Sequence, residues 1–283
     1  MTAVMGGLLA AACFTATLLS SARASRLIGA LPTLAGVMLV STIVVVPLAL
    51  LMVGSTRPSA DSLPYLALAG LGNVFGLLFV YTGLRAGKVG IVGALASSEG
   101  AIAAVMSMAA GEALLAVEAI GVAVVGIGVV LAALGPDPAE ASGPRSTGRA
   151  ILFGTLAGLA FGVSLYSTGR IGADVAIGWA ILPPRVVGLT LITLPLLAAR
   201  RFRVTRPALP FVIVSGVGEV GGSLAVAWGA QASIAVTSAL AAQFATAAAL
   251  IAWLFLGERL GRVQWTGIAA VAVGVVLLAM GAA

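Results

Sequence analysis

The sequence predicts an all-α integral membrane protein with ten transmembrane helices, arranged as two inverted five-helix repeats. Composition is the first observation: of 283 residues, 61% are hydrophobic and 8% charged, and the mean hydropathy is +1.18. No soluble class has this composition. The second observation is internal: residues 63–135 align with residues 209–281 without a gap, at a constant offset of 146.

Glycines make the internal repeat specific. Matches between Ala, Leu and Val are expected by chance in so apolar a chain, but a shared register of glycines is not. The pair Gly111-Glu112 also coincides with Gly257-Glu258. A duplicated membrane unit is typical of secondary transporters. The glycines of the first segment that coincide with glycines of the second are Gly70, Gly72, Gly76, Gly83, Gly121, Gly128 and Gly135.

Hydropathy and polar breaks define the spans. A helix needs about 20 apolar residues to cross a hydrocarbon core of ~30 Å. The spans predicted on this basis are residues 2–20, 31–54, 63–84, 88–109, 114–135, 149–169, 175–199, 209–229, 234–256 and 263–281.

The repeat also predicts the domain organisation. Residues 1–135 form the first five-helix repeat, residues 136–148 a Pro/Gly/Ser-rich linker, and residues 149–283 the second repeat. Because five is an odd number, the two copies must face opposite ways across the bilayer.

Basic residues predict the orientation in the plasma membrane. Of the 15 Lys and Arg residues, the loops after even-numbered spans carry only Arg57 and Arg170, and Arg185 lies inside a span. The remaining 12 lie in the loops after odd-numbered spans. Basic loops stay in the cytoplasm, so both termini are expected outside. The basic cluster at residues 200–206 is read as one of these loops, and no nucleic-acid partner is expected.

Missing residue types exclude several kinds of chemistry. Histidine is absent and Cys13 is the single cysteine, which excludes intrachain disulfides, Cys/His zinc sites and His-based relays. No cofactor, metal or enzymatic activity is expected, and a Gly-Lys-Ser/Thr loop for direct use of ATP is lacking. Any proton chemistry must therefore use carboxylates.

Three charged residues are predicted near the middle of the membrane. Glu99, Arg185 and Glu219 each lie about ten residues into a span, which is ~15 Å deep at 1.5 Å per residue. A charge at this depth costs roughly 2.5–3.5 kcal/mol on insertion scales, so each needs a reason. They are the first candidates for substrate binding or coupling, although Arg185 could instead lock two helices as an ion pair.

Polar neighbours extend this candidate site. Under the offset of 146, Glu219 corresponds to Asn73 and Gln243 to Ser97. Substrate contacts and hydrogen bonds between helices both remain open for these side chains. Tyr81 is included, with packing as its alternative role. The added candidates are Asn73, Ser97, Gln243, Thr246 and Tyr81.

Two further sequence features concern helix ends. Pro183-Pro184 precedes Arg185 and should interrupt its helix, because proline has no N–H to donate. Glu112 and Glu258 each follow a glycine at the end of a span. Both are expected to cap the N-terminus of the helix that comes next.

The segments AAGEALLAVEAIGVAVVGIGVVLAALG (109–135) and FLGERLGRVQWTGIAAVAVGVVLLAMG (255–281), together with Arg185, resemble the EamA-type family of the drug/metabolite transporter superfamily. The resemblance implies a ten-helix carrier that moves metabolites, amino acids or drugs, usually outward, through a central cavity. It departs at two points. Gly100 and Thr246 replace the proline that usually kinks spans four and nine, and better-known members have cytoplasmic termini.

The predicted function is secondary transport of a small molecule by alternating access, with export and proton coupling. In this hypothesis Arg185 binds a substrate carboxylate, while Glu99 or Glu219 carries a proton or holds an ammonium group. Membrane lipids and protons are the other expected partners, and monomer and homodimer both remain open. The alternative is a lipid flippase or lipid-binding scaffold of the same architecture.

Overall fold

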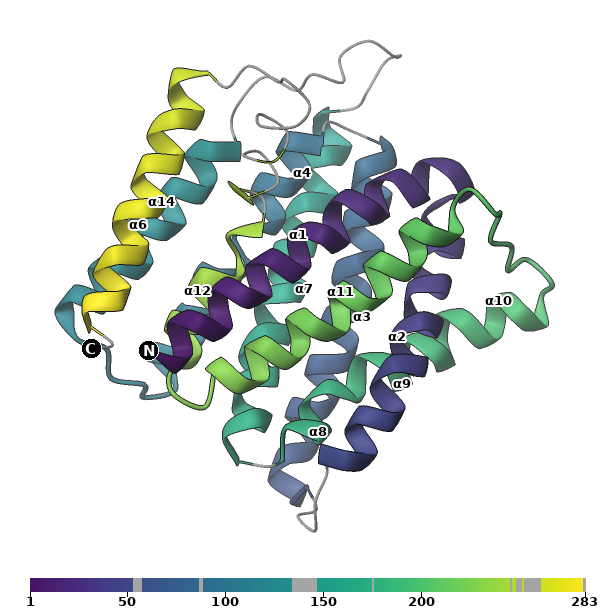
Figure 1. Ribbon diagram of the computed structural model, residues 1–283, viewed down its shortest axis with the longest axis horizontal. Coiled ribbons are helices and arrows are strands. Elements are labelled where there is room, and N and C mark those ends of the chain that lie inside the picture. Colours follow the sequence, from purple (N-terminus) through teal and green to yellow (C-terminus); the bar gives the residue numbers. More distant parts are fainter. Residues whose placement is uncertain are drawn as a thin grey trace.

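The computed structural model describes residues 1–52, 58–86, 89–133, 147–174, 176–244, 246–247, 251 and 261–281, and in these ranges the regular structure is helical (Figure 1). Six segments of the described chain are long and apolar enough to cross a membrane. They are Thr2–Ile28, Ala30–Met52, Ala60–Arg85, Gly148–Ile171, Ile177–Ala198 and Leu209–Gly229.

The elements within and between these segments follow the chain in this order: α1 (Thr2–Ile28), α2 (Ala30–Met52), η1 (Ala60–Ser62), α3 (Leu63–Ala86), α4 (Val89–Ala96), α5 (Glu99–Ala109), α6 (Ala116–Ala133), α7 (Thr147–Asp174), α8 (Ile177–Ile181), α9 (Pro183–Gly188), the π-helical turn η2 (Leu189–Thr193), α10 (Leu194–Ala198), α11 (Leu209–Gly229), α12 (Ile234–Ala241) and α14 (Arg262–Gly281).

Apolar side chains cover the outside of the bundle. On α2, the side chains of Ile43, Leu50 and Leu51 are 66%, 77% and 83% exposed. A soluble monomer rarely exposes so much apolar surface on one helix. A helix satisfies its own backbone hydrogen bonds, so such a surface is stable against lipid. The chain is therefore a multi-pass membrane protein.

The fourth predicted span is interrupted in the structure. Helix α4 ends at Ala96, a turn follows at Ser97 and Ser98, and α5 begins at Glu99. The Ser98 N–H donates to Leu95 O at 3.2 Å, a tighter i→i−3 bond than the α-helix uses. The proline that usually kinks this span is absent, yet the span does not run straight.

A matching interruption occurs in span nine. Helix α12 ends at Ala241, and the Gln243 N–H donates to Leu240 O at 3.1 Å. The two breaks meet, because a Cβ on Gly100 would lie 2.6 Å from Ser238 O and 2.6 Å from the Ala242 Cβ. Only glycine permits this approach.

The break predicted at Pro183-Pro184 is present. Helix α8 ends at Ile181 and α9 begins at Pro183, with Leu182 between them. The N–H groups of Arg185 and Val186 both donate to Leu182 O, at 3.0 and 3.1 Å. The seventh predicted span is thus built from short helical pieces that continue through η2 into α10.

Two equivalent contacts join the first half of the chain to the second. The Ser164 hydroxyl on α7 donates to Ala69 O on α3 at 2.8 Å, and the Thr17 hydroxyl on α1 donates to Ser215 O on α11 at 3.2 Å. Ala69 and Ser215 are equivalent under the sequence repeat. Helix α7 therefore packs on α3 in the same way as α1 packs on α11.

Helices α6 and α14 lie side by side on one flank (Figure 1). A Cβ on Gly121 would lie 3.2 Å from Gly274 O, and a Cβ on Gly128 would lie 2.9 Å from Gly267 O. The two helices are therefore antiparallel, and each crossing pair is the repeat-equivalent of the other. Two inverted copies related by an approximate two-fold axis are expected to give such contacts.

Candidate functional site

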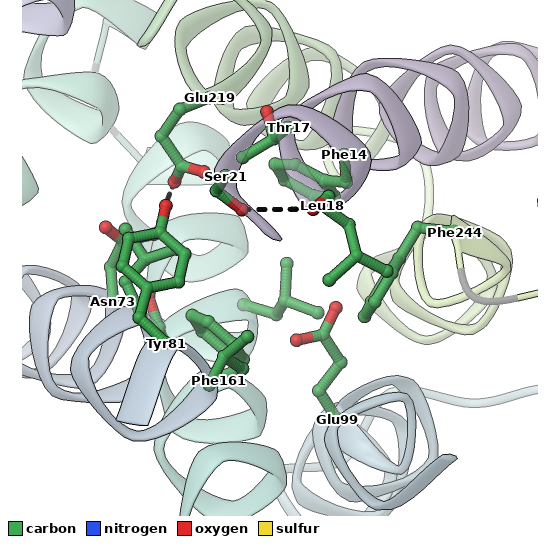
Figure 2. A pocket seen from close by; sticks show the side chains of 14 residues that line it. Phe14, Thr17, Leu18, Ser21, Asn73, Tyr81, Glu99, Phe161, Glu219 and Phe244 are labelled. Atoms are coloured by element: carbon green, nitrogen blue, oxygen red, sulfur yellow. Dashed lines mark hydrogen bonds between the residues drawn. The ribbon is translucent and has the colours of Figure 1, made fainter. Parts of the chain in front are cut away.

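A cavity of about 60 Å³ lies at the centre of the bundle (Figure 2). Helices α1, α3, α5, α7 and α11 line it, together with Phe244 beyond the break after α12. The lining residues are Phe14, Thr17, Leu18, Ser21, Asn73, Leu77, Val80, Tyr81, Glu99, Phe161, Ser164, Leu165, Glu219 and Phe244.

Glu219 enters the cavity from α11 and is held by Asn73 from α3. The Asn73 Nδ2 donates to Glu219 Oε1 at 2.7 Å, and the two side chains are 9% and 2% exposed. The two positions are equivalent in the sequence repeat, separated by 146 residues. A residue that contacts its own repeat-equivalent lies where the two copies meet, so this pair marks that meeting point.

Glu99 enters the cavity from the first residue of α5, directly after the break at Ser97 and Ser98. Figure 2 shows its carboxyl group pointing into the cavity from the side opposite Glu219. The side chain is 4% exposed. No described residue donates a hydrogen bond to its carboxylate. The repeat-equivalent residue in the sequence is Ala245, so this carboxylate belongs to one half only.

Aromatic rings form much of the remaining wall. Phe161 and Phe14 occupy equivalent places, because a Cβ on Gly76 would lie 2.4 Å from the Phe161 ring and a Cβ on Gly222 would lie 2.2 Å from the Phe14 ring. Tyr81 is 1% exposed, and its hydroxyl group has no hydrogen-bond partner among the described residues. Figure 2 shows this hydroxyl directed toward Glu219.

Arg185, which was predicted to bind a substrate carboxylate, is buried and does not line the cavity. It is 1% exposed, and its Nη2 donates to the Ser223 hydroxyl at 3.4 Å. That hydroxyl donates to the backbone oxygen of Glu219 at 2.8 Å. The guanidinium therefore lies beside Ser223, one helical turn along α11 from Glu219. Among the described residues, its Nε and Nη1 atoms have no hydrogen-bond partner.

The predicted residues at the two interrupted spans also lie outside the cavity wall. Ser97, Gln243 and Thr246 are 3%, 5% and 4% exposed. The Gln243 Nε2 donates to Ala239 O of its own helix at 2.9 Å. Of the eight residues predicted, the cavity brings together Asn73, Tyr81, Glu99 and Glu219.

Sequence reasoning missed the hydroxyl groups that α1 and α7 contribute, which are Thr17, Ser21 and Ser164. A signal for them exists. Residues 14–23 read FTATLLSSAR and residues 161–170 read FGVSLYSTGR. This match has an offset of 147, one residue more than the gapless offset of 146, so the comparison without gaps does not find it.

Glu112 caps a different helix from the one predicted. Its Oε1 accepts from the Ser233 hydroxyl at 2.5 Å, and both its oxygens lie 3.3 Å from the Ala235 N–H. Ser233 is the N-cap of α12. The carboxylate of the first half thus binds the N-terminus of a helix in the second half, rather than that of α6. Its counterpart Glu258 lies outside the described residues.

A second pocket, of about 280 Å³, opens beside this contact. Glu112, Ser233, Tyr166 and Arg170 contribute to its lining. Helix α7 connects the two sites, since Ser164 and Leu165 line the central cavity and Tyr166 and Arg170 line this pocket. Arg170 also stacks over the Tyr65 ring, with its Cζ 5.7 Å from the ring centroid.

A multi-pass helical protein with broken helices around a buried, partly polar cavity is of the class of membrane carriers. Comparison with known proteins finds a family that matches the first part of the chain. Residues 1–134 match the EamA-like transporter family. That family is part of the drug/metabolite transporter superfamily, and over these residues the resemblance noted from the sequence is confirmed.

A solved structure agrees with the fold. One crystal structure of a protein superposes with a TM-score of 0.73 at 13% sequence identity, covering 99% of this chain and 99% of its own. At this identity the likeness shows the fold alone. None of the curated proteins compared with the chain matches it significantly.

Proposed function

We propose that the protein is a secondary transporter that carries a small organic solute out of the cell, across the plasma membrane, by alternating access with protons as the coupling ion. One observation carries the proposal: Glu99 and Glu219 bring two carboxyl groups from separate helices into one buried cavity. Carboxylates inside a membrane are costly and typically mark substrate paths or proton relays.

The size of the cavity supports a moving carrier. Sites for organic ligands have volumes of about 300–1,000 Å³. The central cavity has about 60 Å³, so the surrounding helices must separate before a solute enters. The equivalent packing of α1 on α11 and of α7 on α3 supports two inverted units that rock against each other. These units are residues 1–135 and 149–283, with both termini outside.

Counterflow in proteoliposomes tests this function. Vesicles are loaded with a mixture of amino acids, organic acids and organic cations, and exchange of labelled members is followed with wild type and Glu219→Gln. Wild type is expected to exchange at least one class, and Glu219→Gln to lose most of that exchange. Asp61→Asn is the matched control, because Asp61 is an exposed acid in η1 outside the cavity.

Two outcomes contradict the proposal. Folded wild-type protein that exchanges no solute, but moves fluorescent lipids between leaflets, is a flippase. Equal exchange by wild type and Glu219→Gln removes the cavity from the transport path.

A further inference from the structure

We propose that arginines at the end of the bundle opposite the chain termini bind the phosphate headgroups of anionic membrane lipids. This arginine surface consists of Arg23, Arg26 and Arg85, together with the four arginines of residues 200–206. All seven are exposed. The surface is separate from the central cavity, so the inference does not depend on which solute the protein carries.

Three parts of the chain bring these arginines together. Arg23 and Arg26 lie on the last turns of α1. Figure 1 shows that α1 ends beside the beginning of α11, at the opposite end of the bundle from the two chain termini. The segment of residues 200–206 leads directly into α11. From the end of α3, Arg85 reaches the same place, because a Cβ on Gly29, in the turn after α1, would lie 3.8 Å from its Nη1.

The segment of residues 200–206 holds its arginines in fixed directions. Arg201 and Arg203 are exposed, whereas Phe202 and Val204 between and after them are half-buried against the hydrophobic core around α2. Alternating burial of this kind is typical of an extended chain, in which successive side chains point to opposite sides. Packing of the two apolar side chains therefore directs both guanidinium groups outward.

Arg200 occupies a position that the fold alone would assign to glycine. Helix α10 ends with the Arg201 N–H donating to Leu196 O at 2.9 Å and the Arg200 N–H donating to Leu197 O at 3.0 Å, a Schellman motif. Its left-handed residue is Arg200, with a φ of 53°, the only positive φ outside glycine among the described residues. Side chains are strained there. A strained residue that persists indicates a function, and in this case the function is its charge.

The arginine surface has no acidic counterpart. Of the described carboxylates, Asp61, Glu112 and Glu118 lie at the opposite end of the bundle, and Glu99 and Glu219 line the central cavity. Exposed charge of one sign attracts ions of the other sign. The loop charges place this end in the cytoplasm, where the membrane leaflet is anionic.

The choice of basic residue favours phosphate as the anion. Orientation in the membrane requires only positive charge, which lysine and arginine both supply. Of the 15 basic residues, however, 14 are arginine, and Lys88 is the single lysine. A guanidinium group donates two parallel hydrogen bonds to a pair of phosphate oxygens, whereas an ammonium group acts as a point charge. The arginines therefore suit phosphate recognition in addition to setting orientation.

Exposed leucines next to the arginines favour a lipid as the source of the phosphate. Leu27 and Leu31 lie on either side of the turn between α1 and α2, and Leu197 lies on the last turn of α10, before the segment of residues 200–206. All three are exposed. A lipid contacts both kinds of side chain, with its headgroup on the arginines and its acyl chains on the leucines. A soluble phosphate would leave the leucines uncovered.

Thermal unfolding of the full chain in dodecyl maltoside tests the lipid site. The probes are dioleoyl phosphatidylglycerol, dioleoyl phosphatidylcholine with the same acyl chains, and glycerol 3-phosphate without acyl chains. A ligand of the folded state raises the unfolding temperature, and its concentration dependence gives an apparent affinity. We expect phosphatidylglycerol to raise this temperature more than the other two probes. The difference should disappear in about 1 M NaCl, where charges are screened beyond about 3 Å.

Variants separate a lipid site from a structural role of the same arginines. Arg201→Gln and Arg203→Gln should each weaken the apparent affinity for phosphatidylglycerol about fivefold, equivalent to about 1 kcal/mol. Arg200→Gly should unfold at the wild-type temperature or above it without lipid, because the strain is removed, yet bind phosphatidylglycerol more weakly. The control is Arg262→Gln, an exposed arginine that begins α14 on the opposite flank, and it should keep the wild-type affinity (Figure 1).

Three results would overturn the inference. Equal stabilisation by the two lipids would mean that no headgroup site exists. Equal loss of affinity in Arg262→Gln and Arg203→Gln would mean that net charge alone attracts the lipid. Stabilisation by glycerol 3-phosphate as strong as that by phosphatidylglycerol would assign the surface to a soluble phosphate. Each variant is compared only when it elutes as folded protein in detergent.

Discussion

At the scale of single residues, the hydrogen bond from Asn73 to Glu219 joins repeat-equivalent positions that have diverged in charge. Asn73→Leu keeps a similar volume but removes the donor to Glu219 Oε1. A buried acceptor left without its partner costs about 1–3 kcal/mol, and more when it is charged. We expect thermal unfolding in detergent at a lower temperature than wild type, together with reduced transport.

Thr266→Ala is the control for Asn73→Leu. The Thr266 hydroxyl is exposed and bonds only to carbonyls of its own helix, at 2.8 and 3.0 Å. Its loss should change stability little, because exposed substitutions rarely exceed ~0.5 kcal/mol. If the two variants unfold at the same temperature, the Asn73–Glu219 bond makes no contribution of its own.

At the scale of elements, glycines on α3 and α11 set how closely the helices approach and where the rings of the cavity wall lie. Gly76→Ala would place its Cβ 2.4 Å from the ring of Phe161, so the ring must move. Overpacking of this kind costs typically about 1–3 kcal/mol. We expect lower stability and altered substrate affinity, measured by thermal unfolding and by the apparent KM for exchange.

Gly126→Ala provides the matched control on α6, because its Cβ would meet only the Ala101 Cβ at 3.8 Å. Both changes add the same methyl group to a helix, and helix propensity alone favours alanine by about 0.5–1 kcal/mol. The control should therefore be neutral or stabilising. A stabilising effect of Gly76→Ala would contradict this prediction, because it would mean that Phe161 can move away from α3 without loss of stability.

At the scale of the whole molecule, the sequence predicts the depth of charged residues in the membrane and the repeat symmetry better than the direction in which each side chain points. Span counting and the ~15 Å depth estimate identified Glu99 and Glu219, and both reach the cavity. The same depth placed Arg185 in the site, but successive helical residues point about 100° apart, and this side chain reaches Ser223 and not the cavity wall. Depth alone cannot distinguish these directions.

Three other features were missed, the first because the sequence comparison allowed no gap and the other two because they depend on tertiary packing. The hydroxyl groups of α1 and α7 were hidden by a one-residue shift between the halves, from offset 146 to offset 147. The partner of Glu112 is set by tertiary packing across 121 residues of sequence, so a capping rule based on neighbours chose the wrong helix. The helix breaks without proline, at Ser97 and Gln243, lie where Gly100 closely approaches Ser238 and Ala242 in the folded protein.

Glu112 connects the first half of the chain to the N-terminus of α12. This contact lies at the end of the bundle that holds both chain termini, so it affects how the two halves can separate there (Figure 1). Rocking that opens this end must break its bonds to Ser233 and Ala235. Glu112→Ala removes the acceptor and should shift the equilibrium toward opening here, since loss of a helix cap costs about 0.5–2 kcal/mol in the closed state.

A cysteine in the cavity wall reports that opening. Ser164→Cys places a thiol in the wall of the cavity that the two carboxyl groups share. It is made in a Cys13→Ala background so that it is the single thiol. Alanine suits position 13, because the equivalent residue at the offset of 147 is Ala160. A membrane-impermeant maleimide added on the side of the termini should label this thiol about two- to thirtyfold faster in Glu112→Ala, the range that about 0.5–2 kcal/mol would give. Equal rates would mean that the Glu112 contact does not close the path, and that its role is confined to stabilising α12.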